Sequence, residues 1–223
     1  RYRQKIFFLF TELPSGKNPP AETEKLRTDA ASLKKQCNDL GVESLDVHTG
    51  NANTDTVKAL LEGIILSHYQ FLKYFKEGDQ KKNKLSRINL FSEQAGEKDI
   101  QMLTALLEGV YYSRDLVNEP LSYLTAPKLS AEIEKMSNES GFRLEVLEKK
   151  KIEALKMGGL LAVNKGSVDP PTFNILEHKP EKPVNKKPFV LVGKGVVYDT
   201  GGLSLKPTAN SMDYMKSDMA GAA

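Results

Sequence analysis

The sequence predicts an α/β protein: an amino-terminal α/β domain with a largely parallel sheet, linked by a helix to a second α/β region. Two observations support this class. Short apolar runs bounded by glycine and polar residues alternate with longer stretches whose apolar residues recur every three or four positions. The order strand, helix, strand, helix, strand in the first half is typical of parallel sheets.

The first domain is expected to span residues 1–98. We expect strands at Lys5–Phe10, at "VESLDVH" (42–48) and at "RINLF" (87–91). One amphipathic helix should run from residue 22 to 40 and stop at a glycine, and a longer one should run from residue 55 to 75. Cys37 and His68 fall on the apolar stripes of these helices, so both are expected in or beside the core rather than at a reactive site.

The second half begins after a linking helix over residues 99–118, which ends before Pro120 because proline disfavours helical geometry in the residue before it. We assign residues 119–223 to the second domain. Thr125 is expected to cap its first helix, which Gly141 closes. A short helix is predicted in "KKIEALKM" (150–157). Strands are predicted in "RLEVLE" (143–148), "GLLAVN" (159–164), "TFNILEH" (172–178) and "PFVLVGKG" (188–195).

Composition excludes several classes of protein. The formal net charge of +3 over 223 residues, without a basic stripe, argues against a nucleic-acid partner. No apolar run approaches the roughly 18 residues that a membrane span requires, so no membrane partner is expected. The only cysteine is Cys37, which excludes a disulfide framework and favours a reducing, cytoplasmic location.

Charged residues interrupt the glycine-rich stretch "VGKGVVYDTGGLSLKP" (192–207). Lys194 could be the solvated tip of a turn. A phosphate loop is a second reading, although the pattern G-x-x-x-x-G-K-[ST] is absent. A metal site is the third, because Asp199 precedes two glycines and Asp213 and Asp218 follow downstream. Lysine can ligate a metal only as the neutral amine, which burial and a neighbouring dication would favour. The residues alone leave these readings open.

The segment from that stretch through "MDYMKSDMAGAA" resembles the leucine aminopeptidase (cytosol aminopeptidase) family of two-metal exopeptidases. "RDLVNEPLSYLTAP" and "MGGLLAVNKGSVDPP" are similar to upstream parts of the same catalytic domain. The resemblance is strong over residues 114–223 and weak before them. Ser122 departs from the pattern, since asparagine is common there, and the interval from Lys206 to Asp218 is one residue longer than in many members.

The resemblance implies a role for five residues. Lys194 matches a ligand of one metal, Asp199 the carboxylate that bridges both metals, and Asp218 a further carboxylate ligand. Lys206 matches the catalytic lysine beside the substrate carbonyl. Met215 matches a side chain that lines the pocket for the first residue of the substrate.

The resemblance also implies an activity: release of amino-terminal, leucine-like residues from peptides with two divalent ions, zinc or manganese. The family's segment Asn-Thr-Asp-Ala-Glu-Gly-Arg is absent from these 223 residues. It would supply two acidic ligands and an arginine that positions a bicarbonate ion. We therefore expect a fragment that is inactive alone and belongs to a larger protein, which the family implies to be a homo-hexamer. The alternative is a non-catalytic binding or scaffold protein that retains an aminopeptidase-like fold.

Overall fold

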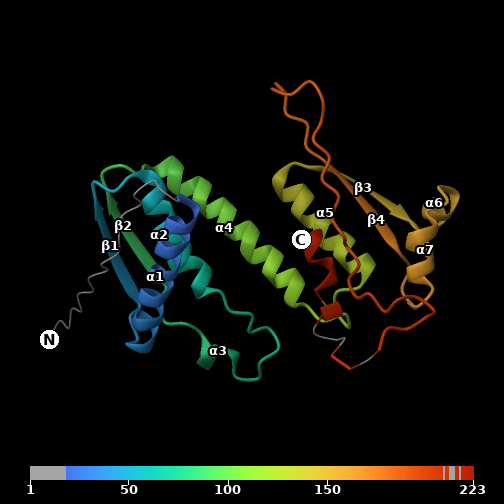
Figure 1. Ribbon diagram of the computed structural model, residues 1–223, viewed down its shortest axis with the longest axis horizontal. Coiled ribbons are helices and arrows are strands. Elements are labelled where there is room, and N and C mark those ends of the chain that lie inside the picture. Colours follow the sequence, from blue (N-terminus) through green and yellow to red (C-terminus); the bar gives the residue numbers. More distant parts are fainter. Residues whose placement is uncertain (1–18, 208, 211–213, 216) are drawn as a thin grey trace. The chain divides into compact units, whose positions relative to one another are not determined.

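A computed structural model describes residues 19–207, 209–210, 214–215 and 217–223 (Figure 1). The strand predicted at Lys5–Phe10 lies outside the described residues. The chain divides into two compact units, Arg1–Tyr111 and Tyr112–Ala223. The division falls within α4 (Glu97–Asn118), the helix that the sequence predicts as a linker.

In the first unit, two parallel strands are packed with helices, as predicted. β1 and β2 pair in parallel, with Val47 opposite Leu90, and helix α2 packs closely against α1. The elements are α1 (Pro19–Asp39), β1 (Ser44–Gly50), α2 (Thr54–His68), α3 (Gly78–Lys81), β2 (Arg87–Ser92) and the start of α4. The core includes Cys37, which is fully buried as expected, beside Ala30 and Ile64.

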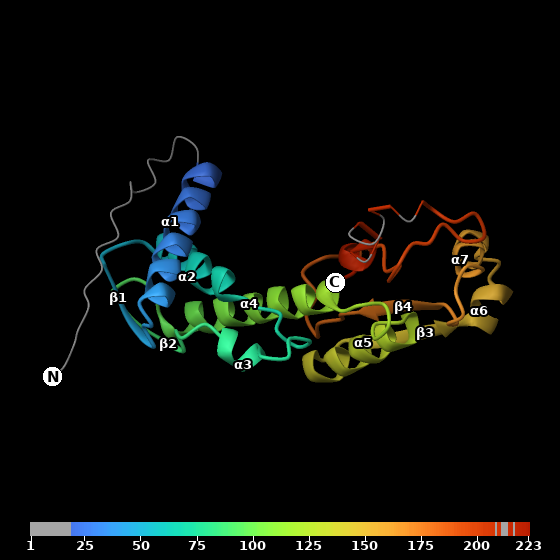
Figure 2. The ribbon, with the colours of Figure 1, turned by 90° about the horizontal axis from the view of Figure 1, so that it is seen from below.

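The second unit contains an antiparallel strand pair covered by one helix. β3 and β4 pair along their full length, and α5 lies against them (Figure 2). Thr125 caps α5 through its hydroxyl, and Gly141 ends the helix in the left-handed conformation at φ 72°; both were predicted. The elements are α5 (Ala126–Ser140), β3 (Arg143–Glu148), α6 (Lys149–Ala154), α7 (Gly158–Asn164), β4 (Thr172–Glu177) and the 3-10 helix η1 (Asp218–Gly221).

The helix predicted to reach Phe75 is shorter in the structure. α2 ends at His68, where Asn83 Nδ2 donates to the His68 carbonyl at 2.8 Å and Tyr69 leaves the helical conformation. Gln70 holds the returning chain, since its amide donates to Lys81 O and accepts from Asn83 N. His68 is half-buried, in agreement with its predicted place at the core boundary.

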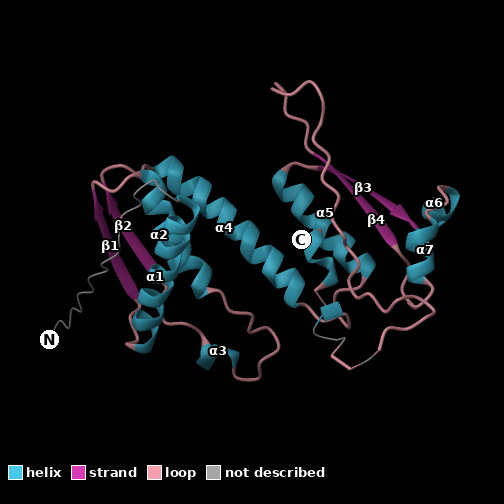
Figure 3. Cartoon of the chain, viewed as in Figure 1, coloured by secondary structure: helices cyan, strands magenta, loops and turns pink. Residues whose placement is uncertain are grey.

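Two predicted strands are wrong. "GLLAVN" forms helix α7, in which Leu161 N bonds to Met157 O. A short apolar run cannot be assigned by periodicity alone, and leucine and alanine favour the helix. "PFVLVGKG" (188–195) is drawn as loop in Figure 3. Residues 189–192 are 78–95% exposed, and no described strand pairs with this run.

Candidate metal and catalytic site

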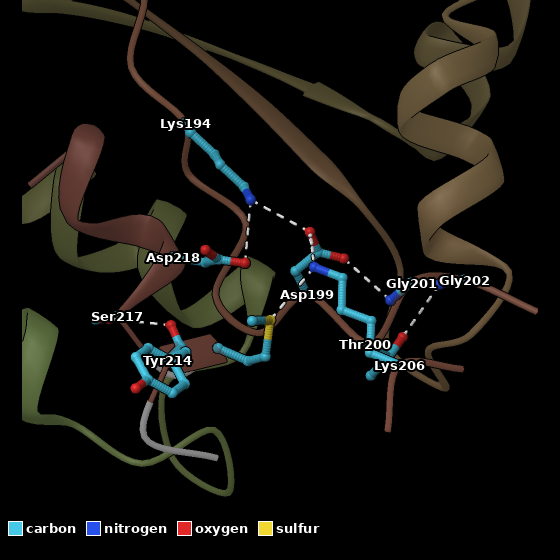
Figure 4. Close-up of polar contacts among 10 residues, drawn as sticks. Lys194, Asp199, Thr200, Gly201, Gly202, Lys206, Tyr214, Ser217 and Asp218 are labelled. Atoms are coloured by element: carbon cyan, nitrogen blue, oxygen red, sulfur yellow. Dashed lines mark hydrogen bonds and ion pairs between the residues drawn. The ribbon is translucent and has the colours of Figure 1, made fainter. Parts of the chain in front are cut away.

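Four of the five predicted site residues converge at one point of the second unit. Lys194, Asp199 and Lys206 come from the loop after β4, and Asp218 begins η1 (Figure 4). Their charged groups lie within 3.2 Å of one another in three pairs. Four residues between positions 194 and 218 thus form one compact cluster of two carboxylates and two ammonium groups.

The backbone around Asp199 forms a tight turn that fixes its carboxylate. Gly201 N–H donates to Asp199 Oδ1 at 3.0 Å, and Lys206 N–H donates to Thr200 O at 2.9 Å. Gly201 and Gly202 have φ of +92° and +86°, a conformation that residues with a side chain rarely adopt. The consecutive glycines therefore allow the chain to fold back and present Asp199 Oδ2 to the cluster.

Asp199 Oδ2 is the centre of the cluster. Lys206 Nζ lies 2.8 Å from this oxygen, and Lys194 Nζ lies 3.2 Å from it. The pKa of Asp199 is lowered to about 2, chiefly by the hydrogen bond from Lys206, with further contributions from the Gly201 amide and Lys194. Asp199 is therefore ionised at neutral pH, the form in which a carboxylate can bind a metal ion.

Lys194 also contacts Asp218, with Nζ 3.0 Å from Oδ2. Contact with Asp218, and then with Asp199, raises the pKa of Lys194. Its side chain is 49% exposed, so burial alone does not favour the neutral amine here. In this arrangement Lys194 is an ammonium paired with both carboxylates. It would become a neutral amine only if another cation replaced its positive charge between them.

Core packing determines where Asp218 lies. The next residue, Met219, is 1% exposed and packs with Leu124 and Leu129. The backbone of η1 also approaches residue 193 so closely that a Cβ on Gly193 would lie 2.3 Å from Gly221 O. Glycine at this position therefore permits the contact between Lys194 and Asp218.

Met215 lies beside the predicted catalytic lysine. Lys206 Nζ is 3.3 Å from Met215 Sδ, so the ammonium is shared between a carboxylate and a thioether. The Lys206 side chain is 39% exposed.

The donors suit a divalent cation but supply only part of a site. Asp218 Oδ2 is buried and lies 3.0 Å from the Lys194 ammonium, so a divalent cation would have to displace that ammonium to reach this oxygen. Within the part of the chain that the structure describes, no group of three or more His, Cys, Asp or Glu side chains could hold an ion. Asp213, the other acidic candidate, lies outside the described residues.

Sequence reasoning did not single out Thr200. Its hydroxyl accepts from Gly202 N at 3.4 Å, and its carbonyl accepts from Lys206 N. Threonine followed by two glycines is a recognisable turn signal, since hydroxyl groups bond to nearby backbone amides. Thr200 thus connects the Asp199 turn to Lys206.

Residues 111–223, just over half of the chain, match a family model described as "Cytosol aminopeptidase family, catalytic domain". The chain belongs to the cytosol aminopeptidase family. A probable cytosol aminopeptidase of Chlorobaculum parvum is 57% identical over 111 residues, which are 50% of this chain and 22% of that protein. One from Protochlamydia amoebophila is 36% identical over 216 residues, covering 93% of this chain and 43% of the relative.

Solved structures show the same fold. The bottromycin maturation enzyme BotP in complex with Mn matches with a TM-score of 0.74 and 28% identity, over 90% of this chain and 42% of that one. A mutant of tomato leucine aminopeptidase matches with a TM-score of 0.76 and 24% identity, over 93% of this chain and 41% of that one. The chain therefore spans less than half the length of the relatives described. None of its described helices combines the length and apolar character needed to cross a membrane.

Proposed function

We propose that this chain forms the amino-terminal domain and the first part of the catalytic domain of a cytoplasmic, metal-dependent aminopeptidase. In this proposal, residues 1–98 form the first domain, residues 99–118 the linking helix and residues 119–223 the first part of the catalytic domain. The observation that carries it is the cluster of Lys194, Asp199, Lys206 and Asp218 inside the region that matches the family's catalytic domain. The substrates would be peptides with a leucine-like first residue.

Lys194, Asp199 and Asp218 would hold divalent ions, of which manganese or zinc suits this mixture of oxygen and nitrogen donors. BotP, a related structure, is described in complex with Mn. When bound, two such ions would activate a water molecule and polarise the scissile carbonyl. The further acidic ligands, and an arginine with its bicarbonate, are proposed to come from a segment outside residues 1–223, as is the assembly into a homo-oligomer.

Lys206 and Met215 would act on the substrate. The Lys206 ammonium, already within 2.8 Å of Asp199, would offset negative charge as it develops on the substrate oxygen. Met215, whose sulfur contacts that ammonium, would give an apolar, adaptable surface to the first side chain of the peptide.

The test compares the complete protein with residues 1–223. Both are purified, metal-stripped and titrated with Mn²⁺, and release of leucine from a leucyl amide is measured. The complete protein should bind two ions and release leucine. Residues 1–223 should bind Mn²⁺ weakly and release none, because a site with few ligands cannot hold an ion firmly. A complete protein that binds Mn²⁺ but cleaves no leucyl amide would favour the scaffold alternative.

A further inference from the structure

The end of α7 approaches the Asp199 turn more closely than side chains would allow. A Cβ on Gly166 would lie 2.5 Å from Gly202 O and 2.8 Å from Thr200 Oγ1. A Cβ on Gly202 would lie 2.7 Å from Ala162 O. Even one added methyl group on either side must therefore displace backbone, which is costlier than moving the end of a flexible side chain.

The atoms that Gly166 approaches are those that shape the turn. Thr200 Oγ1 accepts from Gly202 N, and the neighbouring Gly201 amide holds Asp199 Oδ1. Thr200 O accepts from Lys206 N on the far side of the turn. A shift of this turn therefore moves a proposed metal ligand and the proposed catalytic lysine together.

The loop that carries Gly166 is well fixed by its own hydrogen bonds. Asn164 Nδ2 donates to Asp169 O at 2.9 Å, and Ser167 N donates to Asn164 O at 2.9 Å. Gly166 N donates to Val163 O, which continues the end of α7. By contrast, no strand is formed in residues 178–207, so the turn has no sheet to hold it. Local hydrogen bonds hold both sides of the contact, but only the turn lies in a long segment without a strand, so steric pressure at the contact can be relieved by a shift of the turn.

We propose that Gly166 is a positioning residue of the aminopeptidase site: its missing side chain lets the α7 loop support the Asp199 turn. The inference rests on the proposed function for its catalytic consequence. Gly166 contacts none of the charged groups of the cluster and acts only through the turn. Displacements of about 1 Å in reacting groups can cost about a hundredfold in rate, so a small shift is sufficient for a large effect.

The experiment compares Gly166→Ala with Gly159→Ala in the complete protein. Gly159 lies in α7, the helix just before the loop that carries Gly166, and nothing lies within 4 Å of where its Cβ would be, so alanine there adds the same methyl group without a clash. We expect Gly166→Ala to lower kcat for a leucyl amide by about a hundredfold, with KM nearly unchanged. Hydrogen exchange at Gly201 N–H should accelerate, while amides of β3 and β4 keep their protection. Gly159→Ala should match the wild type in all three measurements.

Asn164→Ala is the second variant, because it loosens the α7 loop without adding atoms to the contact. It should lower kcat and speed exchange at Gly201 in the same direction but less. The proposal is overturned if Gly166→Ala keeps the wild-type kcat and the wild-type exchange rate at Gly201. It is also overturned if Gly166→Ala loses protection throughout β3 and β4 while Asn164→Ala changes neither kcat nor exchange. If the complete wild-type protein shows no peptidase activity, the proposed function fails. The exchange measurement then decides alone: faster exchange confined to the turn supports positioning, and unchanged exchange overturns it.

Discussion

Lys206 Nζ lies 2.8 Å from Asp199 Oδ2, so the proposed catalytic cation and the proposed bridging metal ligand are in direct contact. Lys194 reaches the same oxygen from the other part of the loop at 3.2 Å. Asp199 Oδ2 thus contacts both lysines, and the three residues have different proposed roles. Metal content and turnover must be measured side by side to separate their contributions.

Asp199→Ala should remove metal as well as activity. The substitution deletes the oxygen at the centre of the cluster and leaves Lys194 with one carboxylate neighbour instead of two. In the complete protein, we expect fewer than two tightly bound ions per chain by elemental analysis, and leucyl amidase activity reduced with them. Glu134→Gln, on the exposed surface of α5, controls for the loss of one negative charge. Two tightly held ions in Asp199→Ala would contradict the bridging role.

Lys206→Ala should lower turnover and leave metal content unchanged. Removing a single group that stabilises an oxyanion costs about 2.7–4 kcal/mol, or about a hundred- to a thousandfold in kcat. Lys194→Ala should instead reduce the bound metal. Elemental analysis and kcat for both variants of the complete protein provide the measurement. Metal loss in Lys206→Ala, or nearly full turnover, would show that the assignment of a charge role is wrong.

The parts of the fold that the sequence predicted correctly have local signals. Thr125 and Gly141 mark the ends of α5 through a hydroxyl cap and a left-handed glycine, both of which are properties of the nearby chain. The two wrong strand predictions fall where the nearby sequence does not distinguish a strand from a helix or a loop. Residues 159–164 and 188–195 are short apolar runs, and their state depends on whether a partner strand is present.

The candidate site, like the fold, could be predicted only in part from the sequence. The spacing of Lys194, Asp199, Lys206 and Asp218, read with the family resemblance, identified residues that the structure brings into contact. Their roles stay predictions. The close approach of Gly166 to the Asp199 turn could not be predicted, because it depends on how α7 packs in three dimensions.

Gly63→Ala should destabilise the first unit. A Cβ on Gly63 would lie 2.3 Å from Arg27 O and 2.8 Å from Ala30 Cβ, where α2 packs against α1. Overpacking of this kind costs about 1–3 kcal/mol, although alanine recovers up to about 1 kcal/mol of helix propensity. Urea unfolding followed by the Ile64 methyl NMR signal measures the free energy of unfolding. Gly109→Ala in α4, where the added Cβ meets nothing within 4 Å, should be neutral or stabilising. Equal effects of the two substitutions would refute the packing argument.

The first unit should lose stability as the pH falls below about 6.5, the ordinary pKa of histidine, through His68. Burial lowers the pKa of His68, and the nearby Lys34 cation lowers it further. Its ring Nδ1 is buried and has no hydrogen-bond partner among the described residues, so no acceptor there favours a proton on this nitrogen. The folded state therefore prefers the neutral ring. Stability linked to this group is fully present above the unfolded pKa and is lost as the pH falls through the lower folded pKa.

His68→Gln, which cannot take up a proton in this range, isolates the effect. The free energy of unfolding, measured in urea through the same Ile64 signal, should fall more steeply between pH 7 and pH 5 in the wild type than in His68→Gln. Lys34→Met should lessen the steepness, because it removes the cation that opposes protonation of the ring. If His68→Gln and the wild type lose stability in parallel over this range, protonation of His68 is not the cause.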